Sequence, residues 1–364
     1  MDETKAAVIG LGRMGAFPSE KVQKYAPDCW FPLSHLESLN VSDDIDVVAV
    51  CDQSSASIER VHAAFGDIKA YLDFEEMLAD CRPELVCIAT RTPGRAELIR
   101  RCVENGVKAI HLEKPLCNSV AELATLRSLT QMNNTVLSYG ALRRCFRIYQ
   151  RAKELVDSGQ FGELVQIDVS FGHSQLFWSH PHSIDIVLFF AGDRRFESLR
   201  AHLSEVEVDD LFPQNRILSD PLVDFAVLNF SNNVSAVISR SQGMNIVLNC
   251  SAGKISVLAD GRTLVTESLD GQDPYFKTSN TLLSDSEPCN PEVTYSALSP
   301  LIARMRSNTQ PFVSKHDDWN HDIFLGQEIL FLMAQSHLQR GSELTIADLN
   351  EKMEILAKSD DFYA

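Results

Sequence analysis

The first part of the chain alternates short apolar runs with helical patterns. Five runs are strand-like, over residues 5–9, 46–51, 85–89, 108–112 and 135–139. Continuously apolar runs of this length are typical of parallel strands that are buried on both faces. Helical patterns cover residues 95–105, 119–132, where Ser119 and Glu122 form a capping-box pattern, and 147–158, which Gly159 ends. These patterns predict an α/β domain over residues 1–142.

The second part of the chain changes to a period of two. Apolar and polar residues alternate over 164–171, 222–230, 234–239 and 254–257, and residues 231–233 and 260–261 are typical of hairpin turns. This pattern predicts an antiparallel sheet with one buried face, in a second domain over residues 143–364. Residues 262–300 are rich in Ser, Thr, Asp and Pro and are expected to form surface loops. A long amphipathic helix is expected from about 315 to 340.

A glycine-rich turn follows the first run. It reads Gly10-Leu-Gly12-Arg13-Met14-Gly15, a G-x-G-x-x-G motif. The first glycine makes a tight turn, the second lets the backbone approach a pyrophosphate, and the third lets a helix pack closely, with the phosphates at its N-terminus. The preceding strand and the long α/β alternation favour a dinucleotide site over a turn without a ligand. We therefore expect cofactor contacts from Gly10, Gly12, Arg13, Met14 and Gly15.

The second run ends at Asp52, a carboxylate suited to accept both hydroxyls of an adenosine ribose. Its charge disfavours a 2′-phosphate, so NAD is expected, while Arg13 leaves NADP open. A solvated residue at a strand end is the alternative interpretation of Asp52. It lies 42 residues after the first glycine, where about 20 is usual. Pro18, Pro27 and Pro32 fall in this interval, which indicates an inserted loop in the first crossover.

Polar residues follow the third and fourth runs. Thr90 stands after the third run, and Glu113-Lys114-Pro115 follows the fourth. Ligands of an open α/β sheet bind outside the carboxyl ends of its strands, so we expect Thr90 and Lys114 near a bound nicotinamide cofactor. The Lys114 ammonium is suited to hold a substrate hydroxyl and to stabilise its alkoxide-like state during hydride loss. A lysine in a surface loop is the alternative.

Composition narrows the class of protein. A chain of 364 residues favours two domains, and the net charge of −17 argues against a nucleic-acid binder. The sequence contains no apolar run of membrane-spanning length and does not begin like a signal peptide. None of the nine cysteines has C-x-x-C spacing, so neither a metal cluster nor a redox pair is expected. An odd number of cysteines without a secretion signal favours the cytoplasm.

Several motifs, taken in order, resemble the glucose-fructose oxidoreductase, inositol dehydrogenase and MocA (Gfo/Idh/MocA) family. They are the glycine loop, the strand ending in Asp52, Ala89-Thr90 and Glu113-Lys114-Pro115. The similarity continues through residues 140–146 and 158–163 and through the H-x-x-D segment His182-Ser-Ile-Asp185. The resemblance covers nearly the whole chain, and the Glu-Lys-Pro and H-x-x-D segments are far more specific than the glycine loop.

The resemblance implies a Rossmann domain followed by an α/β domain with a large, open, mostly antiparallel sheet. It also implies a nicotinamide cofactor and, usually, a sugar, cyclitol or related polyol as substrate. The family's glutamate–lysine pair, which bridges cofactor and substrate, corresponds to Glu113 and Lys114. Its acid/base histidine corresponds to His182, and an imidazole suits that role because its pKa lies near neutrality. Members often associate through the open sheet, so a homodimer or homotetramer is expected.

The chain departs from the family pattern near the histidine. Many active members carry an aspartate four residues before it, where this chain has Trp178. Either His180 replaces the missing carboxylate or the proton leaves by another route. Trp178 either offers an apolar face to a sugar ring or a nucleotide base, or covers the core of the second domain. Asp185, on the same helical face as His182, either contacts a substrate hydroxyl or anchors the helix.

Arginines gather near the predicted cleft. Arg91 and Arg95 stand where the family usually has proline and histidine, and Arg143, Arg144 and Arg147 follow the last Rossmann strand. Arg95 is expected to face solvent at a helix start. In a chain of net charge −17, such a group suggests an anionic substrate, such as a nucleotide-sugar or a sugar phosphate, with Arg144 among its contacts. Ordinary helix-surface charge is the alternative.

These features lead to one main hypothesis, an NAD(P)-dependent dehydrogenase or reductase. Hydride passes between a ring carbinol and the nicotinamide, Lys114 polarises the oxygen, and His182 exchanges its proton. On the arginines alone, oxidation at the 3-position of an activated or phosphorylated sugar ranks ahead of free inositol. Two rival hypotheses remain. One is a dinucleotide-binding sensor that resembles the galactose-regulon corepressor of yeasts, and the other is an NAD-dependent glycosidase-type relative.

Overall fold

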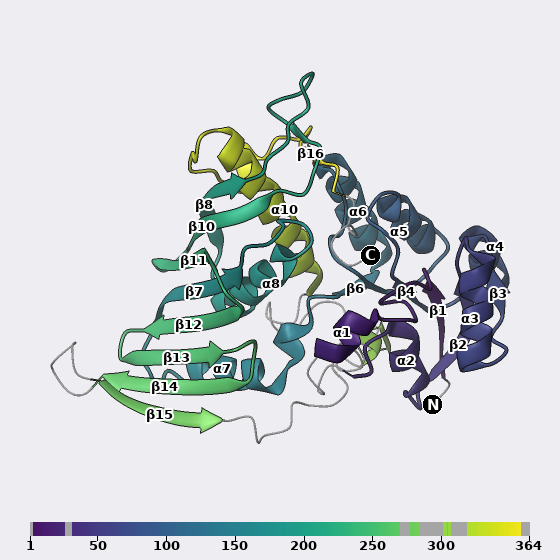
Figure 1. Ribbon diagram of the computed structural model, residues 1–364, viewed down its shortest axis with the longest axis horizontal. Helices are drawn as coiled ribbons and strands as arrows, with labels where there is room; N and C mark the ends of the chain where they lie inside the picture. The colour runs from purple at the N-terminus through teal and green to yellow at the C-terminus, as the bar shows by residue number, and fades with distance from the viewer. Residues whose placement is uncertain are drawn as a thin grey trace.

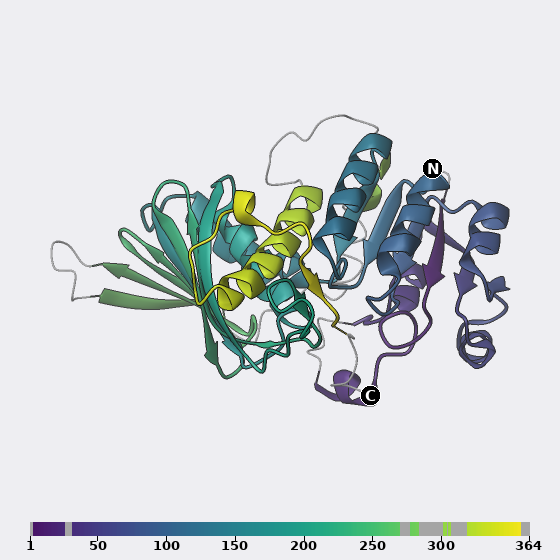
Figure 2. The same cartoon turned by 90° about the horizontal axis from the view of Figure 1, so that it is seen from above.

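The computed structural model describes residues 3–25, 31–269, 277–283, 301–303, 305–306 and 319–357. An N-terminal α/β part lies beside a second part built on a large sheet (Figure 1). Helix α10 (Trp319–Leu338) lies between the large sheet and the N-terminal part, as the yellow-green helix in Figure 2 shows. The chain therefore forms two layered units that share a helix at their junction.

The N-terminal sheet contains six parallel strands in the order β3-β2-β1-β4-β5-β6. They are β1 (Thr4–Ile9), β2 (Ile45–Cys51), β3 (Ala70–Tyr71), β4 (Leu85–Ile88), β5 (Ala109–Leu112) and β6 (Val136–Tyr139). This order is the doubly wound Rossmann arrangement, so the predicted fold of this part is confirmed. The sequence pattern missed β3 because two residues are too few to show a period.

Alternate residues of β1 enter two cores, one on each face of the sheet. Ala7 and Ile9 pack on the face covered by α4 (Phe74–Cys81), α5 (Arg95–Glu104) and α6 (Val120–Asn133). Ala6 and Val8 pack on the face covered by α2 (His35–Asn40) and α3 (Ser55–Phe65). Ser119 and Glu122 form the expected capping box at the start of α6. The sheet is therefore buried on both faces, as its continuously apolar strands predict.

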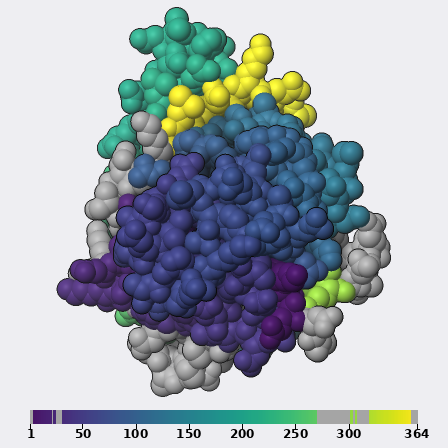
Figure 3. All heavy atoms as spheres, turned by 90° about the vertical axis from the view of Figure 1, so that its right-hand side faces the viewer, coloured from purple at the N-terminus to yellow at the C-terminus, as the bar shows by residue number. Residues whose placement is uncertain are grey.

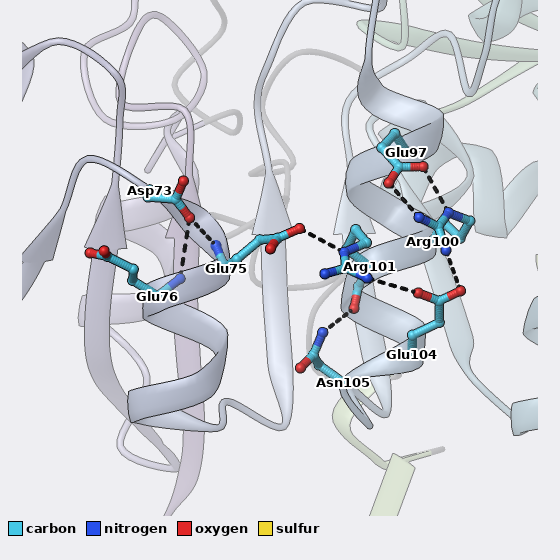
Figure 4. Close-up of polar contacts among 8 residues, drawn as sticks. All are labelled: Asp73, Glu75, Glu76, Glu97, Arg100, Arg101, Glu104 and Asn105. Atoms are coloured by element: carbon cyan, nitrogen blue, oxygen red, sulfur yellow. Dashed lines mark hydrogen bonds and ion pairs between the residues drawn. The ribbon is translucent and has the colours of Figure 1, made fainter.

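The outer surfaces of α4 and α5 carry charged side chains that pair with one another (Figure 4). The Nε atom of Arg101 lies 2.7 Å from Oε1 of Glu75, which joins the two helices. Arg100 pairs with Glu97 and Glu104 within α5. All of these groups are solvent-accessible, so each pair contributes little to stability.

The second sheet contains eight strands in the order β15-β14-β13-β12-β7-β11-β10-β8. They are β7 (Leu164–Gly172), β8 (Phe196–Ser204), β10 (Leu222–Phe230), β11 (Val234–Ser241), β12 (Met244–Cys250), β13 (Gly253–Leu258), β14 (Thr263–Leu269) and β15 (Lys277–Leu283). Only the β7–β11 pair is parallel among these strands. Asn232 and Asn233 have positive φ in the predicted hairpin turn. The predicted mostly antiparallel sheet is confirmed.

Two expectations for the second half are wrong. Residues 262–300 were expected to be surface loops, but β14 and β15 lie within them. Leu264 and Thr266 of β14 are buried, because Ser and Thr are tolerated in a strand whose alternate residues pack on a core. Helix α10 is buried on most sides rather than amphipathic, because it is packed between the two parts of the molecule. The first residues of the expected helix lie outside the described ones.

The chain returns to the Rossmann sheet after its second sheet. Leu301 and Ile302 join the core on the α2–α3 face, and Arg306 donates to the hydroxyl of Thr4 at 2.8 Å. Strand β16 (Glu354–Ile355) pairs with β9 (Arg216–Ile217), and these segments project beyond the Rossmann part at the top of Figure 3. The boundary predicted at residues 142 and 143 remains a prediction.

No helix in the described part of the chain is long and apolar enough to cross a membrane.

Candidate active site

The glycine loop follows β1 and packs against the end of β4. Gly10 has a φ of +88°, and a Cβ on it would lie 2.9 Å from the carbonyl carbon of Ala89. A Cβ on Gly15 would lie 1.8 Å from the carbonyl oxygen of Gly10. Gly12 is exposed, and no atom of the described residues lies within 4 Å of where its Cβ would be. Two glycines are therefore required by backbone packing, and the space at Gly12 suits a pyrophosphate.

The crossover after this loop is interrupted. The N–H groups of Ala16 and Phe17 donate to the carbonyl of Gly12 at 2.9 and 3.1 Å. In residues 11–25, the next helix is the short α1 (Glu20–Tyr25). The helix expected at the phosphates is thus reduced to one turn, because Pro18 has no N–H to continue it. The insertion predicted from the spacing of Asp52 is present.

The inserted segment folds back onto the glycine loop. The N–H groups of His35 and Leu36, the first residues of α2, donate to the carbonyls of Met14 at 2.7 Å and Gly15 at 2.9 Å. These carbonyls are the ones that a continuous helix would have satisfied. Helix α2 therefore replaces the missing part of the crossover and holds the loop in place. Arg13 and Met14 are half-buried in this loop.

Asp52 and Thr90 border the space next to the glycine loop. The carboxylate of Asp52 accepts the N–H of Leu11 at 2.7 Å and that of Ser54 at 2.8 Å. It is thus fixed at the end of β2, where ribose hydroxyls would meet it in a Rossmann domain. The hydroxyl of Thr90 is buried and has no hydrogen-bond partner among the described residues. An unsatisfied polar group at this strand end fits a cofactor that supplies the partner.

Arg95 lies beneath the site instead of facing solvent, so the sequence expectation for it is wrong. Its exposed fraction is 1%. The guanidinium donates to the carbonyl of Glu113 at 2.6 Å and also to the carbonyls of Thr90 and Pro115. Burial lowers the pKa of Arg95 to about 10, which leaves it charged at neutral pH. The first turn of α5 faces the strand ends, and Arg95 satisfies carbonyls there rather than a phosphate.

Glu113 is held by a histidine from the inserted segment. Nε2 of His35 lies 3.3 Å from Oε1 of Glu113. Although burial alone raises it, the hydrogen bond with His35 and the neighbouring positive groups lower the pKa of Glu113 to about 2. A Cβ on Gly140 would lie 2.9 Å from Oε2 of Glu113, so only glycine leaves room for this carboxylate. Glu113 is therefore an ionised carboxylate next to Lys114.

Lys114 is half-buried, and Trp178 holds its ammonium in two ways. Nζ donates to the carbonyl of Trp178 at 2.8 Å and lies 3.6 Å from the centre of its indole ring. The carbonyl and the ring face both attract a cation. Burial lowers the pKa of Lys114 to about 8, while the charge of Glu113 opposes the shift. Trp178 therefore contacts the lysine that is predicted to be catalytic, so it does not serve only to cover the core of the second domain.

His182 lies in the first turn of α8 (His180–Ala191), on the second-domain side of the site. Its Nδ1 atom is buried and has no partner among the described residues. Burial lowers its pKa well below the usual value, and the charges of Arg143 and Lys114 lower it further. His182 is therefore neutral at pH 7, and its pKa lies well below the near-neutral value expected from the sequence. Its role as acid/base remains a prediction.

His180 has two serine partners, and none of its hydrogen bonds reaches Lys114 or His182. Its Nδ1 lies 2.9 Å from the hydroxyl of Ser183, and its Nε2 lies 3.4 Å from that of Ser174. Burial lowers its pKa to about 3. These contacts support a structural role for His180 in fixing the start of α8, rather than the replacement of a missing carboxylate.

The arginines after the last Rossmann strand are neutralised internally. Both lie in the short helix η2 (Leu142–Cys145). Arg144 binds Asp185 through two nitrogens, at 2.7 and 3.0 Å, and Asp322 at 2.9 Å. Arg143 binds both carboxylate oxygens of Asp260 at 2.6 Å. Asp185 therefore anchors α8 to η2 and α10, and neither it nor Arg144 is directed at a substrate by these contacts.

The sequence interpretation missed Asp220, a half-buried carboxylate between β9 and β10. Its oxygens accept the N–H groups of Phe177 and Trp178, each at 2.8 Å. Burial raises the pKa of Asp220 to about 7, and the charge of Lys114 opposes that shift. No motif marks this residue, which is 42 positions from Trp178 in the sequence. It comes to the site only through the folding of the segment before β10.

Comparison with known proteins agrees with this geometry. Residues 4–141 match the model of the Gfo/Idh/MocA oxidoreductase family with an NAD-binding Rossmann fold. A myo-inositol 2-dehydrogenase from Thermotoga maritima is 24% identical over 65% of this chain and 68% of its own length.

Solved structures share the fold of both parts. An inositol dehydrogenase homolog from Azotobacter vinelandii, complexed with NADH and myo-inositol, has a TM-score of 0.71 and 16% identity, over 94% of this chain and 98% of its own. A super-repressor mutant of Gal80p from Saccharomyces cerevisiae also has a TM-score of 0.71, with 13% identity, over 95% and 98%. Residues 4–141 therefore form an NAD-binding Rossmann domain of the Gfo/Idh/MocA oxidoreductase type, and the chain shares its two-part fold with these solved structures.

Proposed function

We propose that the protein is an NAD-dependent dehydrogenase that oxidises a ring carbinol of an uncharged polyol, a cyclitol or a sugar. The observation that carries this proposal is the contact between Lys114 and the start of α8. The half-buried ammonium of Lys114, which follows β5, donates to the carbonyl of Trp178, four residues before the neutral imidazole of His182. The similarity to a myo-inositol 2-dehydrogenase supports the substrate class.

The charges around the site favour an uncharged substrate. Four of the five arginines that suggested a phosphate group are engaged within the chain: Arg143 with Asp260, Arg144 with Asp185 and Asp322, Arg147 with Glu154, and Arg95 with backbone carbonyls. Glu113 and Asp220 add negative charge beside Lys114. A sugar phosphate or nucleotide-sugar, preferred from sequence alone, therefore loses its support, and a cyclitol or free sugar takes its place.

The residues of the site suggest a division of roles. Bound NAD supplies the nicotinamide that accepts the hydride. Lys114 donates a hydrogen bond to the carbinol oxygen and stabilises the negative charge that develops there. His182 is neutral and half-buried, and an imidazole in that state is suited to accept the hydroxyl proton. Asp52 favours NAD over NADP because its charge repels a 2′-phosphate.

The test is NADH formation by the purified protein on a matched panel of myo-inositol, scyllo-inositol, free glucose, glucose 6-phosphate and a nucleotide-sugar. We expect turnover on an uncharged compound. Lys114→Ala should lower kcat by roughly a thousandfold and His182→Ala by roughly a hundredfold, with NAD affinity kept within a few fold. Full turnover by Lys114→Ala on the best compound would contradict the proposed role of Lys114.

A second candidate is a regulator that binds the dinucleotide without turnover. The observation that favours it is Trp178, whose ring and carbonyl already hold the ammonium of Lys114. Stoichiometric NAD binding with no turnover on any panel compound would select this function. A glycosidase-type reaction with recycled NAD would instead consume substrate without releasing NADH.

We further propose a cytoplasmic homo-oligomer. The cysteines in the described part of the chain are free, which suits a reducing compartment. One face of the second sheet is solvent-accessible, with exposed residues such as Arg200 and His202 on β8. Light scattering on the purified protein tests the assembly, and a monomer at micromolar concentration would contradict it.

A further inference from the structure

Asp220 fixes the segment that leads into α8. Its oxygen Oδ1 accepts the N–H of Phe177, and Oδ2 accepts that of Trp178, both at 2.8 Å. The next residue, Pro221, accepts the N–H of Leu176 at 2.8 Å. Three consecutive N–H groups are thus bound by two adjacent residues. This pairing sets the position of Trp178 before α8 begins, and it depends on Asp220 for two of the three hydrogen bonds.

Trp178 passes this placement on to Lys114. Its N–H is held by Asp220, while its carbonyl accepts from Nζ of Lys114 at 2.8 Å and its ring centre lies 3.6 Å from the same nitrogen. A shift of the Trp178 backbone would therefore move both groups that orient the ammonium. Trp178 is therefore the one residue that connects Asp220 to Lys114 in this series of contacts.

Asp220 also acts on Lys114 through its charge. Four charged groups surround the ammonium: Glu113 and Asp220 raise the pKa of Lys114, and Arg95 and Arg143 lower it. The two carboxylates and the two guanidinium groups balance one another, so removal of one carboxylate leaves a net positive charge around the ammonium. The protonated form of Lys114 is then less stable than in the native protein.

We propose that Asp220 is a positioning residue for Lys114, which it orients through Trp178 and whose charge it balances. Asp220 is a second carboxylate beside Lys114, in addition to Glu113, in a chain that has tryptophan four residues before His182. The inference deepens the proposed function, since the role it assigns is exercised on the lysine of the proposed reaction. Asp220 itself touches neither reacting atom.

The experiment measures the pKa of Lys114 directly, without any substrate. The full-length protein is labelled with trace acetic anhydride across a pH series, and acetylation of Lys114 is quantified by mass spectrometry. In Asp220→Asn we expect the pKa of Lys114 to fall by about one unit. The matched control is Asp224→Asn, which removes a carboxylate from the outer part of β10 that pairs with His202 and Arg240. It should leave the Lys114 pKa unchanged.

A second variant tests the contribution of the Trp178 ring to the Lys114 pKa. Trp178→Leu keeps the backbone hydrogen bonds to Asp220 but removes the ring, so the Lys114 pKa should fall while the protein stays folded.

On whichever panel compound is turned over, Asp220→Asn should lower kcat by roughly tenfold to a hundredfold with little change in KM. Thermal unfolding of each variant identifies any that fail to fold.

The outcomes distinguish this inference from the proposed function. An unchanged Lys114 pKa in a folded Asp220→Asn variant overturns the positioning role, whatever the enzyme oxidises. A fall in that pKa in a protein without turnover supports the positioning role and rejects the dehydrogenase. If Asp220→Asn does not fold, Asp220→Glu replaces it. That variant keeps the charge, and a loss of kcat without a pKa shift then supports placement alone.

Discussion

Nε2 of His35 lies 3.3 Å from Oε1 of Glu113, although the two residues are 78 positions apart. His35 opens α2 in the inserted segment, and Glu113 begins the Glu-Lys-Pro turn. The His35 side chain is buried, and its ring packs edge-on against that of His111, with centroids 4.8 Å apart. The insertion in the first crossover thus supplies the partner of the carboxylate beside Lys114.

We predict that His35→Ala lowers the free energy of unfolding by about 1–3 kcal/mol, because it leaves the buried carboxylate of Glu113 without its side-chain hydrogen bond. The measurement is urea denaturation at pH 7. His321→Ala is the control, since its side chain is 65% exposed on α10. Equal midpoints for His35→Ala and the wild type would mean that the contact does not contribute to stability.

The same contact shows which features the sequence could predict. Strands such as β1 and β5 were predicted because their apolar runs are local, and the insertion was predicted because a spacing of 42 residues is long for this motif. That the insertion ends against Glu113 depends on how the broken crossover folds back. No hydrophobic periodicity or sequence motif indicates a contact between residues as distant as His35 and Glu113.

Arg95 and Asp220 illustrate the limit for charged residues. A helix-start arginine and a loop aspartate are usually solvated, so composition places both at the surface. In the structure, both side chains bind backbone groups that have no partner in a helix or strand. Arg95 binds carbonyls at the ends of β4 and β5, and Asp220 binds the N–H groups of Phe177 and Trp178. Lys114 and His182 can be proposed from the sequence because a family motif marks each, and their roles remain predictions.

A variant of Arg95 should harm both the fold and the site. Arg95→Ala removes a buried guanidinium that binds three carbonyls, so we expect the free energy of unfolding to fall by at least about 3 kcal/mol. Arg100→Ala, on the exposed side of the same helix, should change it far less, because its ion pairs are solvent-accessible. Denaturation of the two variants in parallel provides the comparison, and similar losses would contradict the structural role of Arg95.

The carboxylate of Asp52 should decide between the two nicotinamide cofactors. In Asp52→Ala we expect weaker NADH binding by roughly tenfold, because a ribose hydrogen-bond acceptor is lost, and NADPH binding that is no longer disfavoured. Fluorescence titration with both reduced cofactors measures the ratio. Asp46→Ala, on the same strand β2 but exposed, is the matched control. An unaltered NADH-to-NADPH ratio in Asp52→Ala would remove Asp52 from the cofactor site.

Buried histidines should make the protein sensitive to mild acid. Burial lowers the pKa of His111 and of His180 from 6.5 to about 3, and that of His182 well below 6.5. The unfolded chain binds protons at these sites below pH 6.5, whereas the folded chain does not, so stability is present above pH 6.5 and is lost as the pH falls. Each site contributes about 1.4 kcal/mol per pH unit in this window. Burial raises the pKa of Asp220 to about 7 and that of Asp185 to about 6, so these two carboxyl groups take up protons in the folded protein and oppose part of this slope.

Urea denaturation between pH 7 and pH 5 measures this slope. In His180→Gln the absolute stability should drop at every pH, because the contacts with Ser174 and Ser183 change. The slope should become smaller by about 1.4 kcal/mol per pH unit, since one titrating site is gone. His321→Gln, at an exposed position of α10, should keep the full slope. A slope in His180→Gln equal to that of the wild type would show that His180 is protonated in the folded protein.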